Sequence, residues 1–280
     1  MFFSPDSLHT VIPDSTVKSE SGGDWILHHI MDGNYLDFEP LGKIYLPHLE
    51  ILGIDISITR HVVFLWIVAF LLIITFLSVS RSYKKSIIPH GFTNFIETII
   101  LFVRDEIVKP TIGHGYEKFL PYLLTAFFFI LYSNFLGLIP FTATVTSNIA
   151  VTATLAAFTF IATQIGGIIH HGFVGYFKGL IPPGMPAALL PLIVLVEIFG
   201  LFTKPFALCI RLFANMTAGH VVILSLIGLI FIMRTIYFAP ISVGFALFIY
   251  FLELLVALIQ AYIFTMLSSL FIGMAVHQDH

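Results

Sequence analysis

A single arginine, Arg211, interrupts a long apolar run at the head of the stretch RLFANMTAGH. Within a bilayer a cation costs ~2.5–3.5 kcal/mol even on lenient insertion scales, and such residues usually mark ion pathways or counter-ions. An acid four residues away on the same helix could neutralise the charge, but Ala207 and Asn215 hold those positions. We therefore expect the partner of Arg211 to lie on another protein.

Further polar residues recur at helical spacing around Arg211 and in a later part of the chain. Glu197 and Lys204 precede it at intervals of seven residues, so on one helix each side chain lies within ~20° of the next. Glu253 and Gln260 are also seven residues apart and form a second stripe. Ionisable groups at this spacing inside a membrane indicate proton or ion transport.

The turn between the two stripes predicts which residues face each other. His220, nine residues after Arg211, is rotated ~180° from it and points to the other side of the helix. If the turn centres near Tyr237, His220 lies 17 residues before it and Glu253 lies 16 after it, so the two should meet at one depth. By the same count, Arg211 and Gln260 approach a common level.

The composition indicates the class of protein that carries these residues. Hydrophobic residues make up 58% of the chain, charged residues make up 10%, and the mean hydropathy is +0.99, which excludes a water-soluble domain. No basic patch appears, so nucleic acid is not an expected partner. The single cysteine, Cys209, excludes an intrachain disulfide and a multi-cysteine metal site, and we expect neither a metal nor a cofactor.

The apolar stretches predict an all-α polytopic membrane protein with about five membrane helices. The predicted spans are residues 62–80, 119–141, 149–169, 189–233 and 241–276, and an amphipathic helix over residues 92–110 should lie at the membrane interface. The fourth span has 45 residues, which at ~1.5 Å each make ~67 Å, against a hydrocarbon core of ~30 Å. The fifth is also too long, so we expect the two to form a tilted, antiparallel hairpin.

Residues 1–60 differ from the rest, because they hold nine acids against three bases. We predict an acidic extramembrane segment there, followed by a membrane domain of residues 61–280. Arg81, Lys84 and Lys85 follow the first span at once, and the positive-inside bias puts that end inside, with the N-terminus outside and the C-terminus inside. No Arg-rich transit peptide is visible, which favours a bacterial inner membrane over the alternative, a mitochondrial inner membrane.

Several of these stretches together resemble subunit a of F-type ATP synthases, the membrane stator beside the rotating ring of c subunits. The likeness rests on RLFANMTAGH, with SNFLGLIP, EIFGLFTKP and LELLVALIQAYIF in the family's order within residues 62–280. The resemblance implies three partners: a ring of c subunits, peripheral stalk b subunits and the lipid bilayer. It also implies a proton-channel subunit without a catalytic site of its own.

The resemblance implies a central role for the arginine. Arg211 would be the stator arginine that pairs transiently with the carboxylate of the c-ring. Asn215 and Gln260 would shape its surroundings. Arginine suits this role because its guanidinium stays charged and cannot relay a proton itself.

The remaining matches would line two proton half-channels. His220 and Glu253 would serve the outer one, with Asn134 near its mouth, and Glu197 would serve the inner one. Enterobacterial relatives carry an acid and a histidine in exchanged order at the His220 and Glu253 positions, which supports contact between the two. Gly137 stands where some relatives have an acid.

Two other classes of membrane protein compete with this interpretation. A secondary transporter or ion channel with its own midplane site would show internal repeats or paired broken segments, and the sequence shows neither. A purely structural anchor would need no charges inside the membrane.

The coupling ion, H⁺ or Na⁺, is determined largely by the ring.

Overall fold

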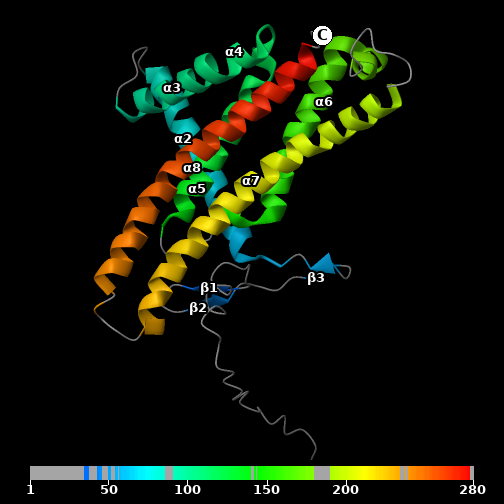
Figure 1. Ribbon diagram of the computed structural model, residues 1–280. Coiled ribbons are helices and arrows are strands. Elements are labelled where there is room, and N and C mark those ends of the chain that lie inside the picture. The colour runs from blue at the N-terminus through cyan, green and yellow to red at the C-terminus, as the bar shows by residue number, and fades with distance from the viewer. Residues whose placement is uncertain are drawn as a thin grey trace, which may run out of the picture.

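The computed structural model describes residues 57–85, 91–139, 144–179, 190–233 and 239–277, residues 142 and 237, and four short strands nearer the N-terminus. Five of its helices are long and apolar enough to cross a membrane (Figure 1). They are α2 (Arg60–Lys85), α5 (Leu120–Gly137), α6 (Ile149–Gly179), α7 (Leu190–Met233) and α8 (Ala239–Val276). The prediction of an all-α polytopic membrane protein with five spans is therefore confirmed.

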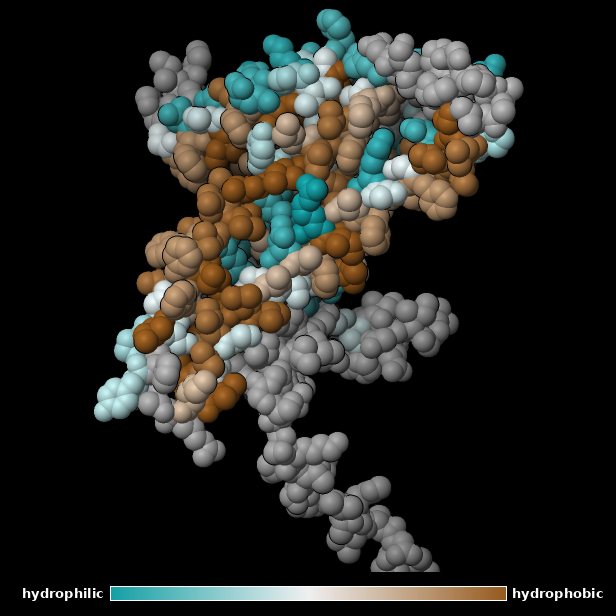
Figure 2. Space-filling model, viewed as in Figure 1, coloured by the Kyte–Doolittle hydropathy of each residue, from teal (hydrophilic) through white to brown (hydrophobic). Residues whose placement is uncertain are grey.

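Large hydrophobic side chains cover much of the outer surface of these helices. On α7, Phe199, Phe202 and Phe206 are each more than 60% exposed, at 64%, 61% and 64%. Figure 2 shows the corresponding hydrophobic surface over most of the hairpin formed by α7 and α8. Apolar surface of this size suits contact with lipid rather than water.

The predicted amphipathic helix consists of three consecutive pieces: α3 (Phe92–Phe102), η1 (Val103–Val108) and α4 (Lys109–Ile112). They lie across one end of the bundle, near the C-terminus (Figure 1). The middle piece, η1, is a π-helix, which the apolar periodicity did not predict. Arg104 and Asp105 of η1 are partly exposed and form an ion pair at 2.8 Å. The hydrogen bond from Arg104 lowers the pKa of the Asp105 carboxyl.

Helices α7 and α8 run antiparallel and diagonally across the bundle (Figure 1). Their 44 and 38 residues make ~66 Å and ~57 Å at ~1.5 Å per residue, so they cross a ~30 Å hydrocarbon core only at a slant. Pro205 lies inside α7 without ending it. The predicted tilted hairpin is confirmed.

Small residues let α8 pack closely against its neighbours. Ala257 and Ala261 are fully buried, and a Cβ on Gly273 would collide with the backbone carbonyl oxygen of Thr111 at the end of the amphipathic segment. The Thr111 hydroxyl also contacts the Ser269 hydroxyl of α8. Close approach through small residues, supported by hydroxyl contacts, is typical of helix packing in membranes.

Helix α6 is longer than predicted. The apolar run ends near residue 169, but the helix continues to Gly179 after a kink at Gly172, whose φ of 69° suits glycine. Tyr176, beyond the kink, is 1% exposed and packs so closely on Gly167 that a Cβ there would overlap its ring. The kink thus returns the end of α6 to the bundle.

Two short antiparallel strand pairs precede α2. Strand β1 (Tyr35–Asp37) pairs with β2 (Lys43–Tyr45), and β3 (Glu50–Ile51) pairs with β4 (Ile54–Asp55). The sequence did not predict these strands. In Figure 1 the labelled strands lie at the end of the bundle opposite α4. The predicted extramembrane segment comprises residues 1–60. Apart from these strands, its residues 1–56 lie outside the described residues.

Candidate functional site

Arg211 lies at the middle of α7. It stands 21 residues after Leu190 and 22 before Met233, the two ends of the helix. Its side chain is exposed, and among the described residues no carboxylate lies within ion-pair distance of its guanidinium. The structure therefore gives no acidic partner for Arg211 in the described part of the chain, and a partner on another protein stays a prediction.

Asn215 lies one turn after Arg211 on α7 and links this part of the helix to α8. Its side-chain amide donates a hydrogen bond of 2.9 Å to Oε1 of Gln260, which is 2% exposed. This bond fixes the register of the two helices, and it brings Gln260 to the depth of the turn that holds Arg211 and Asn215. Figure 2 shows hydrophilic side chains gathered about midway along the hairpin, between two hydrophobic flanks.

His220 and Glu253 meet nearer the turn of the hairpin. The Nδ1 atom of His220 lies 3.9 Å from Oε1 of Glu253, and the two side chains are 25% and 3% exposed. Neither carboxylate oxygen of Glu253 accepts a hydrogen bond from a described residue. A buried carboxylate without hydrogen bonds is costly, so Glu253 is stabilised by a bound proton or by a donor from outside the described residues.

Gly219 explains how Glu253 comes so close to α7. A Cβ at this position would collide with the Glu253 carboxylate. The glycine of RLFANMTAGH therefore leaves the space into which an acid of the neighbouring helix fits. The sequence interpretation did not predict this contact between Gly219 and Glu253.

Asn134 lies on α5 and is completely buried. Its amide donates to the backbone oxygen of Ala257, one turn along α8 from Glu253, at 3.3 Å, and its Oδ1 accepts from the Thr146 hydroxyl at 2.7 Å. Thr146 belongs to η3 (Val145–Ser147), a short turn before α6. Asn134 thus ties three elements together beside the His220 and Glu253 pair.

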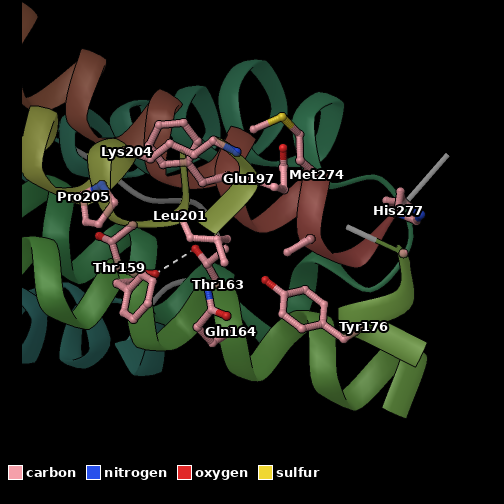
Figure 3. A pocket seen from close by; sticks show the side chains of 14 residues that line it. Thr159, Thr163, Gln164, Tyr176, Glu197, Leu201, Lys204, Pro205, Met274 and His277 are labelled. Atoms are coloured by element: carbon pink, nitrogen blue, oxygen red, sulfur yellow. Dashed lines mark hydrogen bonds between the residues drawn. The ribbon is translucent and has the colours of Figure 1, made fainter. Parts of the chain in front are cut away.

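Glu197 lies in a cavity of about 240 Å³ toward the other end of α7. Figure 3 shows Glu197 and Lys204 from α7 on one side, with Gln164 and Tyr176 from α6 on the other and His277 at one end. At ~30 Å³ per water in the liquid, the volume has room for several waters. The cavity can therefore hydrate a carboxylate inside an otherwise apolar bundle.

The Glu197 cavity and the pair of His220 and Glu253 lie on opposite sides of Arg211 along the hairpin. By the helical rise of ~1.5 Å per residue, Glu197 lies ~21 Å before Arg211 along α7 and His220 lies ~13 Å after it. The structure brings His220 to Glu253 and Asn215 to Gln260, and it keeps Glu197 apart from both pairs. Among the described residues no three acidic, histidine or cysteine side chains gather as metal ligands would.

Sequence reasoning missed several polar residues around these groups. Gln164 and Tyr176 line the cavity, and the Thr144 hydroxyl contacts Nε2 of His220. No periodicity singles them out, since Tyr176 reaches the cavity through the kink of α6 and Thr144 lies in a connecting segment. The run of threonines before α6 was the one available signal.

Comparison with known proteins adds an independent line of evidence. Residues 62–273 match the family described as ATP synthase A chain. The ATP synthase subunit a of Chloroherpeton thalassium is 55% identical over 258 residues, which cover 91% of this chain and 77% of the relative. The ATP synthase subunit a 2 of Chlorobaculum tepidum is 53% identical over 265 residues, covering 93% and 75% of the two chains.

A more distant bacterial relative shows the same likeness. The ATP synthase subunit a of Anaeromyxobacter dehalogenans is 47% identical over 271 residues, covering 91% of this chain and 70% of the relative. These bacterial relatives and the five long apolar helices indicate a multi-pass protein of a bacterial inner membrane. The chain belongs to the ATP synthase A chain family, as a membrane subunit that takes part in proton transport and ATP synthesis.

Proposed function

We propose that this chain is the stator subunit of a rotary F-type ATP synthase, with two offset proton half-channels and Arg211 facing a carboxylate of the c-ring. One observation carries the proposal. Arg211 is exposed at the middle of α7, without an acidic partner among the described residues. A polar cavity lies on one side of it along the helix, and a half-buried histidine paired with a buried acid lies on the other.

The charge of Arg211 determines what a passing carboxylate does. A ring carboxylate that faces lipid is protonated, because a bare anion in hydrocarbon is expensive. Near the guanidinium the ionised form is favoured by the opposite charge, so the carboxyl gives up its proton there. Arg211 keeps its own protons, so it separates the two half-channels instead of joining them.

The two groups on either side of Arg211 then act as inlet and outlet. His220 and Glu253, with Asn134 beside them, exchange protons with the outer side. Glu197, in its hydrated cavity, exchanges protons with the inner side. A proton cannot pass directly between the groups, so it travels on the ring and drives rotation.

The partners and the orientation follow from the same arrangement. The c-ring packs on the face of α7 that exposes Arg211, and the b subunits of the peripheral stalk pack elsewhere on the bundle. Arg81 and Lys84 at the end of α2 favour the inner side for α3, α4 and the C-terminus. Residues 1–60 then form an extramembrane segment on the outer side, and residues 61–280 form the membrane domain.

The experiment compares Arg211→Ala with a matched control, Arg104→Ala, in membrane vesicles that contain the assembled complex. Arg104 is also a partly exposed arginine, but it pairs with Asp105 on the amphipathic segment. We expect Arg211→Ala to abolish ATP-driven proton pumping while passive proton leak persists or rises, and Arg104→Ala to pump normally. Normal pumping by Arg211→Ala would refute the proposal, as would purification of the intact chain without a ring-forming proteolipid.

A further inference from the structure

Thr144 is a buried hydroxyl residue that contacts the outer proton-transfer pair. It is 4% exposed and directly precedes η3. Its Oγ1 contacts Nε2 of His220, and it lies 3.4 Å from the backbone oxygen of Gly137. The other ring nitrogen of His220, Nδ1, faces Glu253. The imidazole is therefore held between a hydroxyl on one side and a carboxylate on the other.

We propose that Thr144 is a positioning residue for proton transfer, because its hydroxyl satisfies Nε2 of His220 in every protonation state while Nδ1 stays directed at Glu253. This inference rests on the proposed function, in which His220 and Glu253 form the outer proton path. It adds a residue to that path and a reason for its chemistry.

A hydroxyl can donate one hydrogen bond and accept others, so Thr144 can serve either state of a ring nitrogen. When Nε2 of His220 is unprotonated, the Thr144 hydroxyl donates to it. When Nε2 carries a proton, it donates to Oγ1, and the hydroxyl proton turns to the backbone oxygen of Gly137, which is within reach. A backbone carbonyl in this place would serve only the second state, and a methyl group would serve neither.

His220 and Glu253 can exchange a proton without another group. The protonated imidazole of His220 gives its Nδ1 proton to the Glu253 carboxylate, so one N–H bond breaks and one O–H bond forms. The ring is left neutral with its proton on Nε2, and that proton is donated to Thr144. The lone pair on Nδ1 then faces Glu253, ready for the return transfer.

The surrounding segment holds Thr144 in place. The Ser147 hydroxyl donates to the backbone oxygen of Thr144 at 2.7 Å, and the Thr146 hydroxyl donates to Asn134 at 2.7 Å. Gly137 leaves space for the Thr144 side chain, because a Cβ at Gly137 would overlap it. The threonine therefore occupies the space beside Gly137 that a larger residue would fill.

Few other titratable groups face His220. Among the described residues Glu253 of α8 is the one within ion-pair distance, and α7 carries no ionisable side chain within two turns of His220. His61 of α2 contacts the same connecting segment, with its Nε2 3.5 Å from the Ser147 hydroxyl. A change in pH dependence on altering Thr144 is therefore attributable to the His220 and Glu253 pair.

The test compares Thr144→Val, which removes the hydroxyl at nearly constant shape, with Thr144→Ser, which keeps it. ATP-driven proton flux per assembled complex is measured across a pH series. We expect Thr144→Val to lower the flux roughly three- to tenfold, the range for one lost hydrogen bond, and to shift the pH profile. Thr144→Ser should retain most of the flux and the parental profile.

A matched control and a second variant keep the test decisive. Thr142→Val removes a nearby hydroxyl whose bonds to described residues are to the backbone oxygens of Leu136 and Ile139, and it should keep the parental pH profile. If Thr144→Val does not assemble, Gly137→Ala displaces the same hydroxyl and should reproduce the shift. Parental behaviour of Thr144→Val, or of Gly137→Ala where that variant is used, would overturn the inference, as would equal losses in the Val and Ser variants. Normal pumping by Arg211→Ala in the same series would instead overturn the proposed function.

Discussion

His220 on α7 and Glu253 on α8 face each other across the hairpin, with Nδ1 and Oε1 3.9 Å apart. The two residues belong to different spanning helices, so their contact joins α7 to α8. Their distance permits proton transfer after a small side-chain rotation or through one water. The two side chains should therefore depend on each other in function, which an exchange experiment can measure.

The first prediction is that exchanging the two residues restores what each single change removes. His220→Glu puts two carboxyls at one depth, where like charges oppose joint ionisation, and Glu253→His removes the acid. Each single variant should lose proton flux, and the double variant should recover much of it. In a double-mutant cycle the coupling should be roughly 0.5–3 kcal/mol, the range for residues in contact. Strictly additive losses at equal assembly would show that the residues act independently.

The second prediction concerns Gly219→Ala. The added Cβ would collide with the Glu253 carboxylate, which is the far end of a flexible side chain and can move aside. We expect near-normal assembly but a clear loss of proton flux, because the carboxylate leaves its place beside His220. The flux is compared with that of Gly200→Ala, a matched change on α7 with no atom near its Cβ. Equal flux in the two variants would mean that the position of the carboxylate is unimportant.

The sequence predicted the hairpin and its contacts because both depend on simple geometry. Spans that are too long must tilt, and the antiparallel register follows from counting residues on either side of Tyr237, which brought His220 to Glu253. The cavity around Glu197 was not predictable in this way. It depends on the positive φ of Gly172, which returns Tyr176 to the bundle. The contact between Thr144 and His220 depends on a connecting segment, so no helical or strand periodicity in the sequence predicts it.

The third prediction concerns stability rather than transport. In Gly273→Ala the added Cβ would collide with the backbone oxygen of Thr111, which cannot move aside as a side chain does. Overpacking of this kind costs about 1–3 kcal/mol. We expect a lower thermal stability of the purified complex and less assembled subunit in membranes. Gly244→Ala, on the same helix with no atom near its Cβ, should be neutral or stabilising. Equal stability of the two variants would contradict the close packing of α8 against the amphipathic segment.

The last prediction concerns Glu197→Gln, which keeps the shape of the side chain and removes its charge. Glu197 lines the cavity together with Lys204, whose ammonium lies 5.8 Å from the centre of the Phe271 ring. A neutral amide neither binds nor releases a proton at working pH. Protons must then pass between the ring and the inner side through the water of the cavity alone. We expect proton flux at limiting driving force to fall several-fold with normal assembly, since the cavity remains hydrated.

The control for this change is Glu106→Gln, which removes an exposed acid of η1 outside the cavity. It changes the net charge of the chain by the same amount, so any general effect of charge on the membrane surface appears in both variants. The difference in flux between Glu197→Gln and Glu106→Gln therefore measures what the cavity carboxylate contributes. Equal flux would assign Glu197 a structural place in the wall of the cavity, and the inner proton path would then run through water without it.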